Sequence, residues 1–196
     1  MPTLHLVPED LRSLYAVHEW RNAAGILQTA CPEEWDDIIA VLREFRLYES
    51  EVTASGGNRS PISRRLDGAF YKRGWIEKKF STAIVLDDKR VDSPTHNIDC
   101  FKGTVALEVE WNNKDPFFDR DLNNFRLLFE LRAIEVGVII TRASELAYIF
   151  GKLGASTTHL DKLLPRLNGG GGGGCPVLVF AITDKLHVLD IPSKGR

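Results

Sequence analysis

Cysteine and long apolar runs are scarce in this sequence, and each shortage argues against a class of protein. The chain of 196 residues has three cysteines, Cys31, Cys100 and Cys175, and no two of them form a CxxC pair. An odd count without such a pair argues against a disulfide framework and against a zinc ribbon. No apolar run approaches the roughly 20 residues that span a bilayer. The first residues lack a basic start followed by an apolar core, so we expect no signal peptide, a cytoplasmic location and reduced cysteines.

Neither sign of charge dominates the chain. Its formal net charge is −2, and 43% of its residues are hydrophobic and 27% charged, the usual balance of a soluble globular protein. This balance argues against disordered, collagen-like and fibrous coiled-coil proteins. At this length we expect a single domain over residues 1–196, with a helical N-terminal part over 1–60 and a core over 62–190.

The charges are nevertheless distributed unevenly. Residues 1–51 contain four Lys or Arg against ten Asp or Glu, whereas residues 52–90 contain nine against four. A basic segment in an otherwise acidic chain could face phosphates. The alternative is a solvated helix face, and charge alone favours this alternative.

The spacing of apolar residues predicts three helices in the first part of the chain. The first follows Pro8 and ends at Gly25, and the second begins at Pro32. One face of the second helix is apolar and consists of Trp35, Ile38, Ile39, Leu42 and Phe45. The third helix covers residues 62–75.

The second half changes to strands with intervening helices. Residues 104–111 (TVALEVEW) alternate with period two and predict a strand with one apolar face. A helix over 119–135 and an apolar strand over 136–141 follow. Strand, helix and strand in this order predict a parallel pair joined by a right-handed crossover. The sequence therefore favours an α/β fold with a mixed central sheet flanked by helices.

Short elements complete the prediction. They are a strand or hairpin over 76–88 with a polar turn at Asp87 and Asp88, helices over 144–150 and 158–164, and strands over 176–182 and 186–189 that could pair as a hairpin. The glycines at 169–174 resemble a phosphate-binding loop in composition alone. Since no Lys-Ser or Lys-Thr pair follows them, we interpret this run as a flexible surface linker.

Two glutamates stand on the other face of the predicted 104–111 strand. Glu108 and Glu110 are two residues apart, so their Cβ atoms lie about 6–7 Å apart on one side of the sheet. Burying both without a counter-charge would be expensive, and an exposed strand face is the simpler alternative. Asp99 precedes Glu108 by nine residues, so a hairpin turn between them can bring all three acids to one edge. Three converging carboxylates would suit Mg²⁺, which prefers oxygen ligands.

The spacing Asp99-x8-Glu108-x-Glu110 resembles the PD-(D/E)xK nuclease core. VALEVEWNNKDPFFDRDLNNFR, VGVIITR, and STTHLDKLLPRL followed by GGCPVLVFAI are similar to the BglII/BstYI group of type II restriction endonucleases. The resemblance covers residues 62–190 and is loose over the N-terminal helices. The chain departs from the broad pattern in two ways. Glu110 stands where Lys is usual and cannot supply a positive charge to the phosphate, and Pro94 is not adjacent to Asp99.

The resemblance implies a restriction-endonuclease-like core that hydrolyses phosphodiester bonds of double-stranded DNA. Asp99 and Glu108 would hold Mg²⁺, which polarises the scissile phosphate and lowers the pKa of a bound water. Glu110 would orient or deprotonate that water for in-line attack. Whether Glu110 or a metal-bound water alone acts as the general base stays open.

Recognition of bases is expected from two segments. The first follows the catalytic strand and consists of Asn112, Asn113 and Lys114. Asn can bind adenine bidentately and Lys can reach guanine, although a plain turn is the alternative. The second, where the resemblance places base-reading residues, consists of Ser156, Thr157, Thr158 and His159. An ordinary helix N-cap is the alternative there.

These expectations combine into a Mg²⁺-dependent, sequence-specific endonuclease acting at a short palindromic site, with a GATC core suggested by the relatives. Cutting both strands of such a site favours a two-fold homodimer, with helices near 62–79 or 119–135 at its interface. A cognate DNA methyltransferase is expected in the cell, though not as a bound subunit. The alternatives are a structure-selective or nicking nuclease with the same core and a non-catalytic DNA-binding protein with this fold.

Overall fold

The structure is a computed structural model that describes residues 2–54, 59–92, 95–154 and 156–190. Its main sheet contains β1 (Tyr15–Trp20), β3 (Ile76–Lys79), β6 (Asn97–Lys102), β7 (Val105–Val109), β8 (Val136–Arg142) and β9 (Val177–Ile182). These strands are ordered β1-β9-β8-β7-β6-β3, with parallel pairing between β7, β8 and β9 and antiparallel pairing elsewhere. The predicted α/β class with a mixed central sheet is confirmed.

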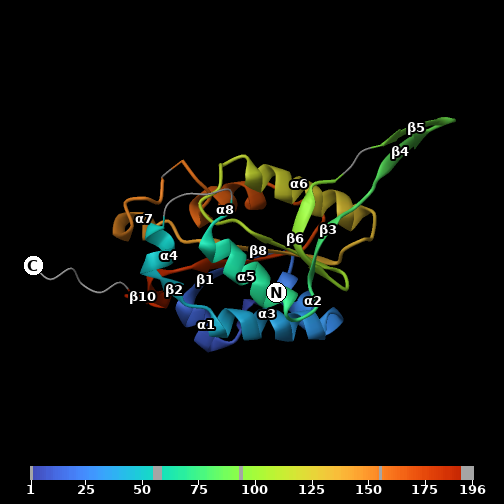
Figure 1. Cartoon of the computed structure of the whole chain (residues 1–196). Helices are drawn as coiled ribbons and strands as arrows, with labels where there is room; N and C mark the ends of the chain where they lie inside the picture. The colour runs from blue at the N-terminus through green and yellow to red at the C-terminus, as the bar shows by residue number, and fades with distance from the viewer. Residues whose placement is uncertain (1, 55–58, 93–94, 155, 191–196) are drawn as a thin grey trace, which may run out of the picture.

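Helices cover both faces of this sheet (Figure 1). One face carries α1 (Glu9–Leu14), α2 (Ala23–Ala30), α3 (Pro32–Glu44) and α5 (Pro61–Tyr71), and the other carries α6 (Phe117–Glu130) and α8 (Leu160–Asn168). Successive residues of β7 point to opposite faces of the sheet. Leu107 packs in the apolar cluster under α1, α2, α3 and α5, and Ala106 packs in the cluster under α6 and α8. Both faces of β7 are therefore buried, including the face that carries the glutamates.

The strand, helix and strand predicted in the second half form as expected. Residues 105–109 of β7 pair in parallel with residues 136–140 of β8, and α6 connects the two strands. Gly137 lets α6 approach the sheet closely, because a Cβ at this position would lie 2.3 Å from Cδ2 of Phe125. The predicted helix over 119–135 instead ends at Glu130, and Arg132 takes the left-handed backbone conformation that turns the chain into β8.

The N-terminal part is not wholly helical, so the prediction of one helix between Pro8 and Gly25 is wrong. The chain leaves α1 directly into β1, which pairs antiparallel with β9 from Tyr15↔Ile182 to Trp20↔Val177. Residues 15–20 add an edge strand to the sheet beside β9, and β9 lies far away in the sequence. Local apolar spacing could not reveal it. The second and third predicted helices are confirmed as α3 and α5.

The predicted hairpin between residues 176–182 and 186–189 is also wrong. Both edges of β9 are already paired, one with β8 and the other with β1. The chain instead passes through a 3-10 turn at Asp184–Leu186 to β10 (His187–Val188), which pairs in parallel with β2 (Leu47–Tyr48). The helices α4 (Glu49–Thr53) and α7 (Leu146–Ile149) lie near this small second sheet (Figure 1).

The glycines at 169–174 form a turn whose first half is exposed, as predicted, and whose second half packs against the protein instead of forming a flexible linker. The carbonyl of Gly173 accepts hydrogen bonds from Trp20 Nε1 at 3.4 Å and from Arg21 Nε at 3.2 Å. Gly173 has a φ of 58°, and a Cβ there would lie 2.6 Å from the side chain of Arg126. Glycine is required at this position both by the backbone conformation and by the close approach to α6.

A hairpin of β4 (Ala83–Leu86) and β5 (Lys89–Asp92) extends away from the main sheet (Figure 1). Its turn lies at Asp87 and Asp88, as predicted, and Asp87 has a φ of 51°. Among the described residues, no helix combines the length and the apolar character needed to cross a bilayer.

Candidate active site

The antiparallel pairing of β6 with β7 brings Asp99 opposite Glu108. The register Cys100↔Leu107 continues to this pair, and the N–H of Asp99 donates to Glu108 Oε2 at 3.3 Å. Asp99 Oδ2 accepts from the N–H of Val109 at 3.1 Å. The hairpin expected from the nine-residue spacing therefore forms and brings these two acids to the same end of the sheet.

Glu110 follows β7 and continues the same line of acids. Its N–H donates to the carbonyl of Ile140 at 2.8 Å, which keeps the backbone beside β8. Its Oε2 accepts from Asn113 Nδ2 at 2.8 Å, and its Oε1 lies 3.3 Å from Arg120 Nη2. Glu108 and Glu110 are each only 1% exposed, so the simpler alternative of an exposed strand face is wrong.

Two residues at the start of α6 complete the site and were missed from the sequence. Arg120 Nη2 lies 2.7 Å from Asp121 Oδ1, and the guanidinium stacks over Phe117 at 4.2 Å from the ring centroid. Asp121 is buried and falls on the apolar face of α6, three residues after Phe118 and four before Phe125. An acid on an apolar helix face is the signal that could have identified it.

Burial and mutual repulsion shift the protonation of these acids. The pKa of Glu108 is raised well above its ordinary value, first by burial and then by the charges of Asp121 and Asp99. Burial and the charge of Asp121 raise the pKa of Glu110 to about 9. Burial raises the pKa of Asp121 to about 6, although Arg120 opposes the change. The group therefore carries more acids than its cationic partners neutralise, and it holds protons near pH 7.

A second ion-paired group lies on the other side of Asp99. Arg59 forms a short ion pair with the buried Asp67 and lies 3.8 Å from Asp99 Oδ1. The pKa of Asp67 is raised to about 7, first by burial and then by the charge of Asp99. Neither Arg59 nor Asp67 was predicted as a site residue. Asp67 belongs to α5, and only the packing of this helix on β6 brings it close.

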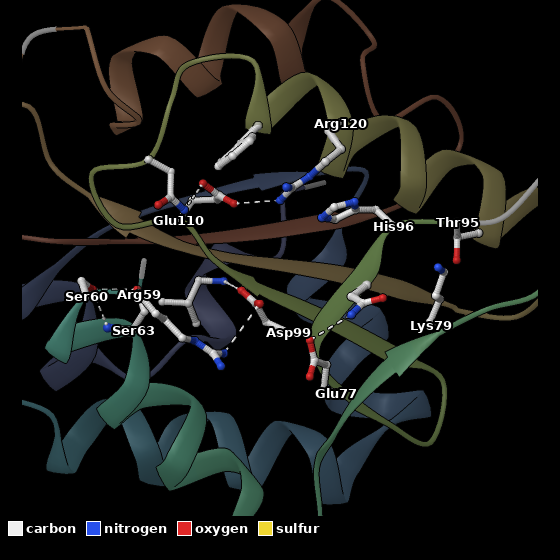
Figure 2. Close-up of a pocket in the computed structure, with 14 residues that line it drawn as sticks. Arg59, Ser60, Ser63, Glu77, Lys79, Thr95, His96, Asp99, Glu110 and Arg120 are labelled. Atoms are coloured by element: carbon white, nitrogen blue, oxygen red, sulfur yellow. Dashed lines mark hydrogen bonds and ion pairs between the residues drawn. The ribbon is translucent and has the colours of Figure 1, made fainter. Parts of the chain in front are cut away.

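Asp99, Glu110, Arg120 and Arg59 border a cavity of about 460 Å³, and the buried Glu108, Asp121 and Asp67 lie behind them. Figure 2 shows Asp99, Glu110 and Arg120 around it, with Arg59 on the left of the view and His96 and Lys79 on the right. The basic segment over 52–90 is divided between two environments. Arg59 and Lys79 line the cavity, whereas Arg65 and Arg73 pair with acids elsewhere. The segment is therefore divided, and contact of its cavity residues with phosphates stays a prediction.

The two segments predicted to contact DNA lie side by side. The N–H of Asn113 donates to Thr158 Oγ1 at 3.0 Å, and the N–H of Thr158 donates to the carbonyl of Asn113 at 2.9 Å. Lys114 and Thr157 form an isolated antiparallel bridge, and Thr157 Oγ1 donates to Asn112 Oδ1. The 112–114 turn and the 156–159 loop thus form one surface beside the acids.

Exposure differs among these candidate residues. Ser156 and Lys114 are exposed, and Asn112, Asn113 and His159 are half-buried. Thr158 is completely buried. Its hydroxyl accepts from Asn113, so Thr158 supports the turn and has no surface to present to a base.

The acids of this site offer donors of the kind that a divalent cation prefers. Among the described residues, no three His, Cys, Asp or Glu side chains are grouped closely enough to hold a metal ion. The chemistry of the group nevertheless suits a hard cation, since Asp99 and Glu108 offer carboxylate oxygens on adjacent strands. Glu108 Oε1 is buried and has no hydrogen-bond partner within the described part of the chain. A cation at Asp99 and Glu108 would satisfy this oxygen.

The mixed sheet, with acids converging beside a cleft and two adjoining loops, defines a nuclease with the restriction-endonuclease fold. The family model described as "Restriction endonuclease BglII/BglIII" matches residues 15–182, and the chain belongs to this family. The protein is therefore a type II site-specific deoxyribonuclease, and its partner is DNA. A comparison with curated proteins finds no match.

Proposed function

We propose that this endonuclease cuts double-stranded DNA at a short palindromic site with Mg²⁺ as its cofactor. The observation that carries the proposal is the placement of Asp99 and Glu110 on one cavity, with Glu108 buried behind it and hydrogen-bonded to Asp99. The joined 112–114 and 156–159 segments lie next to these acids. Family membership favours this function over a structure-selective or nicking nuclease and over a non-catalytic DNA-binding protein.

Asp99 and Glu108 are the proposed ligands of the cation. When bound, Mg²⁺ would polarise the scissile phosphate and lower the pKa of a bound water. Glu110 would orient the attacking water or accept its proton, and the hydrogen bond from Asn113 holds one of its carboxylate oxygens. Two main-chain hydrogen bonds fix Asp99 and Glu108 on adjacent strands, so these acids need little rearrangement before reaction.

Base recognition is proposed for the accessible residues of the two joined segments. These are Asn112, Asn113, Lys114, Ser156 and His159. Thr157 and Thr158 would support them through their contacts with Asn112 and Asn113. Because the segments adjoin the acids, a duplex with its backbone in the cavity would present base edges to them.

The proposal also covers the domain organisation, the oligomeric state, the location and the recognition site of the protein. The chain would act as a single nuclease domain over residues 1–196 and as a homodimer, which matches the two-fold symmetry of a palindrome. It would act in the cytoplasm beside a methyltransferase that protects the same site in host DNA. A GATC core is the site we would test first, because the resemblance suggests it.

Digestion of a sequenced phage genome, followed by mapping of the new ends, tests this function. We expect discrete fragments in Mg²⁺ and none in Ca²⁺ or in a chelator. All ends should fall within one short palindromic sequence. Ends without a common sequence would contradict site specificity, and equal cleavage in a chelator would contradict the role of the cation.

A further inference from the structure

Arg120 is a group of the cavity that the proposed mechanism does not yet use. It lies in the first turn of α6, and its Nη2 is 3.3 Å from Glu110 Oε1 and 2.7 Å from Asp121 Oδ1. The guanidinium also stacks on the ring of Phe117. These contacts hold a charged, planar donor at the cavity wall, with 28% of the side chain exposed.

The position of this charge matters because Glu110 stands where the broad nuclease pattern has Lys. A phosphate that is being attacked gains negative charge on its non-bridging oxygens, and a fixed cation stabilises this charge. Arg59 and Lys79 are further cationic side chains on the cavity. Arg59 is paired with Asp67 and Asp99, whereas Arg120 adjoins Glu110, the proposed partner of the attacking water.

We propose that Arg120 contacts the scissile phosphate and supplies the positive charge that position 110 lacks. The inference rests on the proposed function. The water oxygen forms a new bond to phosphorus while the bond from phosphorus to the leaving sugar oxygen breaks. One water proton passes to the general base, and the leaving sugar oxygen takes a proton from solvent. Arg120 faces the non-bridging oxygens throughout, and a guanidinium can donate two parallel hydrogen bonds to them.

The same geometry predicts an effect that does not depend on cleavage. Arg120 pairs with Glu110 and Asp121 beside the proposed cation ligands Asp99 and Glu108, so its positive charge repels a divalent cation bound there. Removing the guanidinium should therefore strengthen the binding of Ca²⁺ to the free protein while weakening catalysis. A residue with only a structural role would not change these two quantities in opposite directions.

The test compares Arg120→Gln and Arg120→Lys with the wild type. Arg126→Gln is the matched control, because Arg126 is exposed on the same helix and away from the cavity. Four quantities are measured on the full chain. They are the single-turnover rate on a plasmid with a mapped site in Mg²⁺, the Kd for that DNA in Ca²⁺, the Kd for Ca²⁺ alone by calorimetry, and the melting temperature.

We expect Arg120→Gln to lower the rate by roughly 10²–10³-fold, the usual effect of losing one transition-state donor, with a much smaller change in the Kd for DNA. Arg120→Lys should recover part of the rate, and Arg126→Gln should match the wild type. Arg120→Gln should bind Ca²⁺ more tightly. A rate within about threefold of the wild type, well below that usual effect, would overturn the proposal.

An equal loss of rate in Arg120→Gln and Arg120→Lys, with unchanged Ca²⁺ binding and a lowered melting temperature, would also overturn it. A wild type that cuts no DNA would instead overturn the proposed function. The calorimetry would then still decide whether the charge of Arg120 acts on the cation site, and unchanged Ca²⁺ affinity in Arg120→Gln would reject that part of the inference.

Discussion

Asp99 and Glu108 are joined by a hydrogen bond from the main chain of one to the side chain of the other, since the Asp99 N–H donates to Glu108 Oε2 over 3.3 Å. Asp99 Oδ2 accepts in turn from the N–H of Val109 at 3.1 Å. Both contacts cross the antiparallel pair of β6 and β7. The relative position of the two acids is therefore set by the pairing of β6 with β7.

Replacing either acid should abolish cleavage without abolishing recognition. We expect Asp99→Ala and Glu108→Ala to lower the rate by at least about 10²-fold, the scale of loss seen when a group that stabilises the transition state is removed. Site-specific binding should persist or tighten, because repulsion of the phosphates falls. The measurements are cleavage in Mg²⁺ and the Kd for DNA in Ca²⁺. Glu130→Ala, at the exposed end of α6, is the control, and near wild-type cleavage by either test variant would contradict the site assignment.

The free protein should lose stability as the pH rises. The pKa of Glu110 is raised from 4.5 to about 9 in the folded chain, so the folded state binds a proton that the unfolded state has released. The stability that this group contributes is fully present below pH 4.5 and is lost as the pH rises toward about 9.

Melting temperatures measured in a chelator between pH 5 and pH 9 check this dependence. We expect the melting temperature of the wild type to fall with pH over this range and that of Glu110→Gln to fall less steeply, because Gln carries no titrating proton. Equal slopes for the two proteins would show that the burial of Glu110 does not govern the dependence.

Asn113 should contribute to base discrimination as well as holding Glu110. If it contacts a base edge, Asn113→Ala should weaken binding to the cognate site by about 1–3 kcal/mol and relax discrimination at one symmetric base-pair position. Non-specific binding and its salt dependence should barely change. The measurement is a set of Kd values in Ca²⁺ for the cognate site and its single-base variants.

Two results would contradict that role for Asn113. A lower cleavage rate with unchanged Kd values would leave Asn113 only its contact with Glu110. A uniform loss of affinity for every sequence would mean that it positions the DNA backbone, and recognition would then pass to the 156–159 segment.

Gly137 should tolerate no side chain. A Cβ at this position would lie 2.3 Å from Phe125, so Gly137→Ala should destabilise the fold by about 1–3 kcal/mol through overpacking between α6 and β8. Gly68→Ala is the control, because Gly68 lies within α5 and a Cβ there has no other atom within 4 Å. This control should gain about 0.5–1 kcal/mol. Urea unfolding measures both changes, and equal stability of the two variants would refute the packing argument.

The sequence alone was sufficient for the elements whose pattern is local. Period-two alternation identified β7, and the apolar face of residues 32–45 identified α3. The same locality explains why Asp99 and Glu108 could be paired in advance. Only nine residues separate them, and a short hairpin aligns opposite residues once its turn is placed.

What the sequence could not reveal depends on contacts between distant segments. Residues 15–20 became a strand because β9 offered an open edge, and residues 187–188 paired with β2 because β9 had no edge left. Propensity and spacing carry no information about which edges remain open, since this is decided only when the whole sheet is assembled.

The same limit applied to the site. The sequence predicted that Asp99, Glu108 and Glu110 come together through one hairpin, but it did not identify Arg59, Asp67, Arg120 or Asp121. Arg59 and Asp67 lie just before or within α5, and Arg120 and Asp121 lie in α6. They come close to the acids only when α5 packs against β6 and the start of α6 lies beside the end of β7. The raised pKa values of Asp67 and Asp121 arise first from burial, and burial is a property of the tertiary structure.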